Sequence, residues 1–241
     1  MMRSTDATDY QNVPRDVAVM EKTFAAGTKT GWHAHERSQV LFASTGLMFA
    51  STEKGAWVVP EKHALLIPAN LSHIVTMHGQ VQMQTAYISP TITNAFATDS
   101  CRVVTVSELL SATLGALAQE PVEYDTAGRG FHLSALVLDE IQRAADAPLA
   151  LPMPRDQRLR RICQTLIDQP DIPYGLDMWA DEAAMSRRTF TRHFRAETGF
   201  SFVNWRRRLR VLQALTLQAS GYSTLEAANT VGFRKTQSLK Q

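Results

Sequence analysis

The stretch MSRRTFTRHFR, residues 185–195, places four arginines and two phenylalanines in what the spacing predicts to be one helix. At about 100° per residue, positions 187, 188, 191, 192 and 195 share one side of that helix, and Phe190 and Phe194 lie on the other. One face can therefore be buried while the other is cationic. Taken alone, the stretch fits a solvated surface helix equally well, so the flanking sequence has to decide.

The residues before this stretch predict a second, shorter helix. In GLDMWADEAAMS, residues 175–186, apolar residues recur at helical spacing from Leu176 to Ala183. The tripeptide AMS supplies a turn, and Ser186 is a suitable N-cap for the arginine-bearing helix. Two helices joined by such a turn form a helix-turn-helix, whose second helix lies in the major groove of DNA. The cationic face then serves to contact DNA.

A longer helix and a similar second motif follow. The stretch GFSFVNWRRRLRVLQALTLQAS, residues 199–220, has apolar residues at helical spacing and four more arginines near its start. GYSTLEAANTVGF, residues 221–233, repeats the order of a Ser/Thr cap, a short apolar helix and a turn at Gly232. RKTQSLKQ, residues 234–241, would begin another recognition helix. The sequence therefore predicts an all-α C-terminal domain with two helix-turn-helix units.

Charge divides the chain near the same place. Residues 1–152 contain 10 Lys and Arg against 15 Asp and Glu, whereas residues 153–241 contain 15 against 8. Between the two parts, DAPLALPMPRD (146–156) carries three prolines in seven residues, which is typical of a stiff connector. The basic C-terminal third predicts a part of the chain that binds a polyanion, and the acidic remainder predicts a part with a different function.

Composition excludes several classes of protein. With 44% hydrophobic and 20% charged residues, the chain of 241 residues fits an ordinary globular protein. Its N-terminus has no apolar segment typical of a signal peptide, and no apolar run approaches the roughly 20 residues of a membrane span. Cys101 and Cys163 lack a paired spacing and are predicted to be buried thiols in a reducing compartment. We therefore expect a cytoplasmic protein without membrane contact.

The N-terminal part of the chain is predicted to form β structure. From about residue 16 to residue 90, short β-type runs recur at intervals of roughly 8–12 residues, which favours an antiparallel sandwich or barrel. Within it, STG (44–46) and TEKG (52–55) are predicted to be tight hairpins. After residue 100 the spacing changes and predicts amphipathic helices over residues 106–119, 131–145 and 155–168. The fold class is therefore multi-domain α+β.

One set of polar residues in the β region has metal-ligand spacing: His33, His35, Gln39 and His73. Alternation along a strand would place both imidazoles of His33 and His35 on one face, and Gln39 on the same face. Imidazole is a ligand for Zn, Fe, Ni or Cu, and an amide oxygen is a weaker one than a carboxylate. The alternative is that these groups hydrogen-bond to an organic effector or to one another.

The C-terminal motifs resemble a known family. ADEAAMSRRTFTRHFRAETGFSFVNWRRRLRVLQALTLQ followed by STLEAANTVGF is similar to the DNA-binding domain of AraC/XylS-family bacterial transcription regulators, over about residues 155–241. The resemblance implies that Arg188, Thr191 and Arg192 face the bases and that Arg187 and Arg195 contact phosphates. In the second unit it implies DNA contacts by Arg234, Lys235 and Gln237.

The sequence departs from the family pattern at two places. Ala184 stands in the first turn, where the family commonly has glycine. The chain also stops at Gln241, inside the second recognition helix, so we expect the second helix-turn-helix to be truncated in this chain.

The histidine pattern resembles a cupin barrel, which AraC/XylS regulators commonly carry as their effector domain. Together the two resemblances imply three regions: an effector-binding barrel over 1–100, a helical linker or dimerisation region over 101–152, and the DNA-binding domain over 153–241. The implied function is a homodimeric, non-enzymatic transcription regulator that responds to a small molecule and controls a neighbouring transporter or metabolic gene. The alternatives are a metal-dependent cupin dioxygenase or isomerase, and a protein–protein adaptor with a helical tail.

Overall fold

The computed structural model describes residues 4–53, 55–92, 100–219 and 221–233. The chain forms two compact units, one made of residues 1–53 and 57–150 and the other of residues 54–56 and 151–241. Along the chain, the division falls within the proline-rich connector 146–156. Among the described residues, no helix combines the length and apolarity that crossing a membrane requires.

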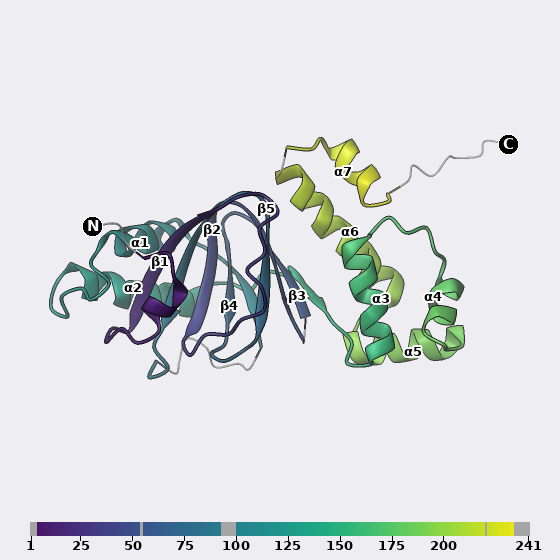
Figure 1. The fold of residues 1–241 in the computed structure, drawn as a ribbon, viewed down its shortest axis with the longest axis horizontal. Coiled ribbons are helices and arrows are strands. Elements are labelled where there is room, and N and C mark those ends of the chain that lie inside the picture. Colours follow the sequence, from purple (N-terminus) through teal and green to yellow (C-terminus); the bar gives the residue numbers. More distant parts are fainter. Residues whose placement is uncertain (1–3, 54, 93–99, 220, 234–241) are drawn as a thin grey trace. The chain divides into compact units, whose positions relative to one another are not determined.

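Among the described residues, the first unit contains most of one curled, seven-stranded sheet (Figure 1). The strands lie in the order β1-β5-β2-β3-β7, and β4 pairs with both β2 and β6. The long strand β2 therefore joins the two parts of the sheet. The elements in chain order are η1 (Ala7–Tyr10), β1 (Val17–Phe24), β2 (Ser38–Thr52), β3 (Gly55–Val59), β4 (His63–Ile67), β5 (His73–Ile88), β6 (Arg102–Thr105), α1 (Glu108–Gln119), α2 (Arg129–Arg143) and β7 (Ala150–Pro152).

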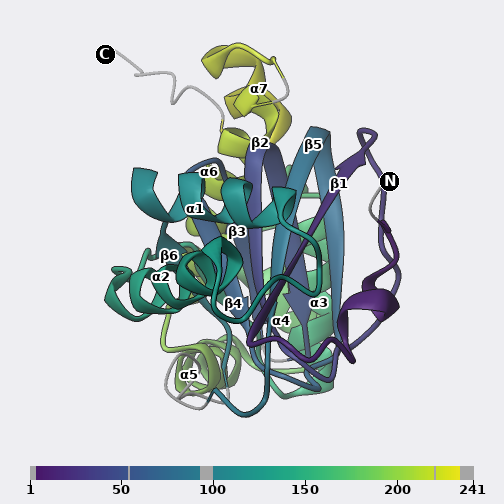
Figure 2. The same ribbon diagram turned by 90° about the vertical axis from the view of Figure 1, so that its left-hand side faces the viewer.

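Side chains along the strands alternate between two apolar cores. On β1, Ala18 and Met20 belong to the core inside the barrel, whereas Val17 and Val19 belong to a second core on the outer face. Helices α1 and α2 contribute to that second core and lie across the strands (Figure 2). Because both faces are covered, alternation buries apolar side chains on both sides of the sheet.

The region predicted as a separate helical segment, residues 101–152, lies largely within the barrel unit. Strand β6 pairs with β4, and the apolar faces of α1 and α2 pack against the outer face of the sheet. These helices bury their apolar stripes on the sheet of the first unit, and the compact unit to which they belong ends at residue 150.

The predicted hairpin at residues 44–46 is a bulge within β2. The pairing of β2 with β5 shifts register on both sides of Thr45, and Gly46 has a φ of 83°. A Cβ at Gly46 would lie 2.4 Å from the Gln80 carbonyl oxygen, which explains the glycine. A bulge bends a strand sharply, so β2 continues where the sequence suggested a turn. The hairpin predicted at residues 52–55 connects β2 and β3 and includes residue 54, which lies outside the described residues.

After strand β7, the described residues of the second unit form only helices and their connections, as predicted. Both cysteines of the chain are free and buried, also as predicted, and burial raises the pKa of the Cys163 thiol. The helices of this unit are α3 (Gln157–Asp168), α4 (Leu176–Glu182), α5 (Arg187–Thr198), α6 (Phe202–Ala219) and α7 (Thr224–Thr230).

Candidate nucleic-acid interface and barrel cavity

Helix α5 turns an aromatic face into the core of its unit. It begins after Ser186, whose side chain accepts a hydrogen bond from the Thr189 amide, which confirms the predicted N-cap. Phe190 and Phe194 are both 0% exposed. Their ring centroids lie 5.1 Å and 5.3 Å from that of Phe202 on α6. Edge-to-face packing of this kind determines how α5 is rotated about its axis, and hence where its other face points.

The other face of α5 is exposed and cationic. Arg188, Arg192 and Arg195 are exposed, and none of them forms an ion pair with a described residue. Arg187 lies 3.2 Å from Asp177, but the side chains are 64% and 69% exposed. Such a surface pair contributes about 0–1 kcal/mol and is easily exchanged for another anion. Thr191 lies between the arginines and is half-buried. The predicted arginine stripe is therefore available to a polyanion.

Ala184 adopts the left-handed conformation in the turn between α4 and α5. Its φ is 51°, and the next residue, Met185, donates its backbone N–H to the Ala180 carbonyl at 2.9 Å. Alanine thus takes the backbone conformation that glycine would favour, at a cost of about 1 kcal/mol. The departure from the family pattern leaves the turn intact.

The turn after α7 has the same construction. Gly232 has a φ of 82°, and Phe233 donates its backbone N–H to the Ala228 carbonyl at 2.8 Å. Helix α7 begins with a capping box formed by Ser223 and Glu226. The predicted DNA contacts Arg234, Lys235 and Gln237 lie outside the described residues.

Two arginines of α6 hold the unit together. Arg206 donates to the Tyr174 carbonyl at 2.7 Å, and Arg210 donates to the carbonyls of Pro170 and Gly232, each at 2.9 Å. Burial, with a smaller effect of the Arg210 charge, lowers the pKa of Arg206 to about 10. These bonds attach both the chain before α4 and the turn after α7 to α6. The sequence shows that this helix carries arginines, but it does not show that two of them bind main-chain carbonyls within the unit.

The segment leading into α3 is bonded to α5 and α6. Glu197 on α5 accepts hydrogen bonds at Oε2 from the backbone amides of Arg155 at 2.6 Å and Asp156 at 2.9 Å. Trp205 on α6 donates from Nε1 to the Pro152 carbonyl at 2.8 Å. The connector is therefore attached directly to the helix that carries the exposed arginines.

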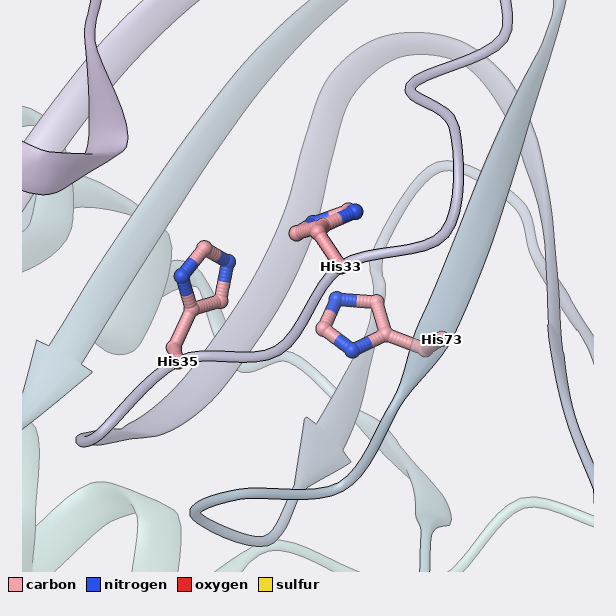
Figure 3. A group of neighbouring side chains, drawn as sticks. All are labelled: His33, His35 and His73. Carbon is pink, nitrogen blue, oxygen red and sulfur yellow. The ribbon is translucent and has the colours of Figure 1, made fainter.

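Three histidines meet in the barrel unit (Figure 3). His33 and His73 form an isolated antiparallel bridge, and His35 follows in the loop before β2. Their ring centroids lie 4.3–5.5 Å apart, and each ring offers a nitrogen within 4.8 Å of the others. Gly31, with a φ of 77°, turns the chain immediately before His33, so a loop holds the pair where the sequence suggested a regular strand.

The hydrogen bonds of two rings leave Nε2 for a ligand. His33 Nδ1 lies 3.0 Å from the Gly31 carbonyl, and His73 Nδ1 lies 2.9 Å from the Leu71 carbonyl. A carbonyl only accepts, so Nδ1 carries the proton and Nε2 presents a lone pair. This tautomer is the one in which Nε2 binds a metal or accepts from a ligand.

Three buried polar atoms of the predicted site residues have no hydrogen-bond partner among the described residues. They are His35 Nε2, His73 Nε2 and Gln39 Oε1. The Gln39 amide is held at its other end, where Nε2 donates to Thr85 Oγ1 at 2.9 Å. Each unsatisfied buried group costs about 1–3 kcal/mol. The four predicted residues therefore fit a bound cation or polar ligand.

Burial keeps His35 and His73 neutral. It lowers the pKa of both His35 and His73 to about 4, and the charges of the neighbouring histidines act in the same direction. Both rings are consequently unprotonated near neutral pH, which is the form that ligates a metal.

A cavity of about 580 Å³ extends from this cluster. His33, His35 and Gln39 line one part of it, and the apolar side chains of Met20, Leu41 and Met83 line another. Lys22 and Lys29 also line the cavity, and sequence reasoning missed both. The available signal was the alternation along β1, which places Lys22 on the same face as Ala18 and Met20.

Comparison with known proteins gives one family match and several similar proteins. Residues 179–241 match the family described as Helix-turn-helix domain. The HTH-type transcriptional regulator NimR of Escherichia coli is 26% identical over 204 residues, covering 85% of this chain and 74% of NimR. RipA of Corynebacterium glutamicum, also an HTH-type transcriptional regulator, is 38% identical over 88 residues, covering 36% of this chain and 27% of RipA. The structure of ToxT from Vibrio cholerae aligns with a TM-score of 0.39 at 8% identity, covering 91% of this chain and 94% of ToxT.

The two units define a DNA-binding regulator with a ligand-sized cavity in a separate domain. A helix-turn-helix presents the arginines, and a barrel holds the histidines. Over residues 179–241 the chain carries a helix-turn-helix domain, and over 85% of its length it is similar to an HTH-type transcriptional regulator. Its relatives are named as transcription regulators, which supports a non-enzymatic function over the cupin-enzyme alternative.

Proposed function

We propose that this regulator binds double-stranded DNA through α5 and that a small molecule in the barrel cavity controls this binding. The observation that carries the DNA-binding role is the division of α5, with Phe190 and Phe194 fully buried and its arginine face exposed. Arg188 and Arg192 lie at the centre of that face and are assigned to bases, since bidentate arginine–guanine contacts are the commonest specific ones.

The remaining residues of the face position the helix. Arg187 and Arg195 flank the central pair and are assigned to phosphates, which set register without reading sequence. Thr191 is assigned to a base edge. Its hydroxyl donates to the Arg187 carbonyl at 3.0 Å, which leaves its methyl group and a lone pair for the groove.

We assign the histidine cluster to a divalent transition metal, one of Zn, Fe, Ni or Cu. His33, His35 and His73 would each ligate it through nitrogen, and Gln39 through Oε1. Such an ion supplies a Lewis-acid centre to which an effector can bind. Metal analysis of the purified full chain tests this assignment, and a metal-free protein that still binds its effector through the same atoms would overturn it.

We assign homodimer formation to the α1–α2 region. Leu109 on α1 and Phe131 on α2 are 49% and 42% exposed, which is unusual for side chains of this size. Sedimentation of the full chain and of a Leu109→Asp variant tests the assignment. We expect the variant to dissociate at concentrations where the original chain is dimeric.

DNA binding is tested by capturing operator sites from fragmented genomic DNA of the source organism with the purified full chain. We expect a small set of enriched sites, and loss of that enrichment in the double variant Arg188→Ala, Arg192→Ala. Arg143→Ala on α2 is the matched control, because its side chain is 73% exposed and lies in the barrel unit. Equal enrichment by the double variant would overturn the assignment of α5.

A further inference from the structure

Strand β5 doubles back so that both of its ends approach the histidine cluster. His73 is its first residue, and Tyr87 lies near its last, yet their rings lie 5.5 Å and 4.9 Å from the ring of His35. Both halves of β5 therefore lead away from the cluster, the first half from His73 and the second half from Tyr87. The distance between the histidines and a residue partway along either half of β5 therefore follows from the number of strand residues between them.

Lys22 and Lys29, which line the cavity, each lie beside one half of β5. Lys22 pairs with Met83, four residues from Tyr87, and Lys29 bridges to Thr76, three residues from His73. At about 3.4 Å per residue, these positions are roughly 10–14 Å along the strands from the cluster. Both lysines line the cavity. We call the part that they line the lysine end, as distinct from the histidine end lined by His33 and His35.

The cavity is short of negative charge. Among the described lining residues, the one carboxylate is Asp6, which caps η1 by accepting from the Thr8 amide at 2.9 Å and the Thr8 hydroxyl at 2.8 Å. These bonds lower the pKa of Asp6, and the charge of Lys22 makes a smaller contribution in the same direction. Lys22 donates to the Thr5 carbonyl at 3.0 Å, and an ammonium group has three donors, so two remain. The lysine end therefore favours an anionic group.

Apolar side chains line the cavity between the two ends, because Met20 and Leu41 both pair with Thr85, which lies between Met83 and Tyr87 on β5. Met20, Leu41 and Met83 all line the cavity and belong to the core inside the barrel. Methionine side chains adapt to irregular ligand shapes. A hydrocarbon segment can lie along these side chains with little desolvation cost.

We infer that the effector is an elongated organic dianion with an apolar middle, bound with one acidic group at the histidine end and the other between Lys22 and Lys29. This inference rests on the proposed function of the cavity as the effector site. The acidic group at the histidine end binds the metal held there. Charge at both ends then distinguishes the ligand from monoanions, diols and diamines of the same length.

The test uses the full chain loaded with cobalt(II) and four series of straight-chain probes: dicarboxylates, monocarboxylates, diols and diamines of matched length. Calorimetry gives affinities, and the methyl resonances of carbon-13-labelled Met20 and Met83 report occupation of the cavity by any class of compound. We expect one length of dicarboxylate to bind about tenfold or more tightly than the matched monocarboxylate.

The double variant Lys22→Met, Lys29→Met should lose this preference while its affinity for the monocarboxylate stays the same. The control variant Arg143→Met, whose substitution lies outside the cavity, should keep the preference for the dicarboxylate. An unchanged cobalt absorption spectrum shows that the variants are folded. If a diol or diamine binds in the cavity as tightly as the dicarboxylate, the dianion inference is wrong and the cavity remains the effector site. If no probe of any class shifts Met20 or Met83, the proposed effector site itself is contradicted.

Discussion

Ala184 and Gly232 occupy the same left-handed position in two turns of identical construction. Their φ values are 51° and 82°, and in each turn the next residue closes the preceding helix with a backbone hydrogen bond. One position carries a Cβ and the other has no room for one. Exchanging the residue types should therefore change the stability of the second unit in opposite directions.

Ala184→Gly should stabilise the second unit slightly. Glycine removes the strain of a left-handed alanine, about 1 kcal/mol, and part of this gain is offset by the greater freedom of glycine in the unfolded chain. The expected net gain is about 0.5 kcal/mol in the free energy of unfolding. Urea unfolding followed by fluorine-labelled Trp179 and Trp205, both buried in this unit, measures it. A loss of stability would show that Ala184 makes contacts worth more than the strain.

Gly232→Ala should destabilise the unit by about 2 kcal/mol or more. A Cβ there would lie 2.8 Å from Asp171 Cα and 2.9 Å from Arg210 Nη2. Gly199→Ala is the matched control, because Gly199 has a φ of 77° but no atom within 4 Å of its Cβ position. The control isolates backbone strain, about 1 kcal/mol. Equal losses in the two variants would mean that the crowding at Gly232 is relieved by a shift of the arginine.

Features that depend on local sequence were predictable. The division of α5 into a phenylalanine face and an arginine face follows from helical spacing, and Ser186 follows from capping preferences. The proximity of His33, His35 and His73 follows from spacing that resembles a known site. In each case neighbouring residues carry the information, or a familiar pattern does.

Features that depend on long-range packing were not predictable from the sequence. The bulge at Gly46 looks like a hairpin in the sequence, because a bulge and a turn use the same residue types. In the sequence, Arg206 and Arg210 are two of the arginines near the start of a helix, and only the folded chain shows the carbonyls that they bind. Lys22 and Lys29 line one cavity only in the folded chain, where they pair with different parts of β5.

Arg192→Ala and Arg195→Ala should weaken DNA binding in different ways. Loss of a base contact at Arg192 should cost about 1–3 kcal/mol on the preferred site and relax specificity at one base position. Loss of a phosphate contact at Arg195 should weaken binding to all sequences and reduce the slope of log K against log salt by about one. Titrations of preferred and scrambled sites at several salt concentrations separate the two. Identical effects would show that the two arginines do not differ in role.

Replacing both His33 and His73 by alanine should abolish metal binding and the effector response while operator binding remains. The expectation follows from their place in the barrel unit, apart from the helices that carry the arginines. Metal content and operator affinity with and without effector are the measurements. His63→Ala is the control, because His63 also bonds a nearby carbonyl, that of Glu61 at 3.0 Å, but lies outside the cluster. A double variant that still responds would contradict the assignment of the cavity.

Arg206→Ala should destabilise the second unit, whereas Arg207→Ala should not. Arg206 is half-buried and donates to main-chain carbonyls before α4, so its removal leaves those carbonyls without a charged donor. Hydrogen bonds from a charged group are worth about 1.5–3 kcal/mol. Arg207 is the next residue on α6 and is exposed, so its loss should change the free energy of unfolding by no more than about 0.5 kcal/mol. Unfolding followed at Trp179 and Trp205 gives both values, and hydrogen exchange of the amides before α4 should rise only in Arg206→Ala. If the two variants unfold alike, the bonds of Arg206 do not hold the chain before α4 in place.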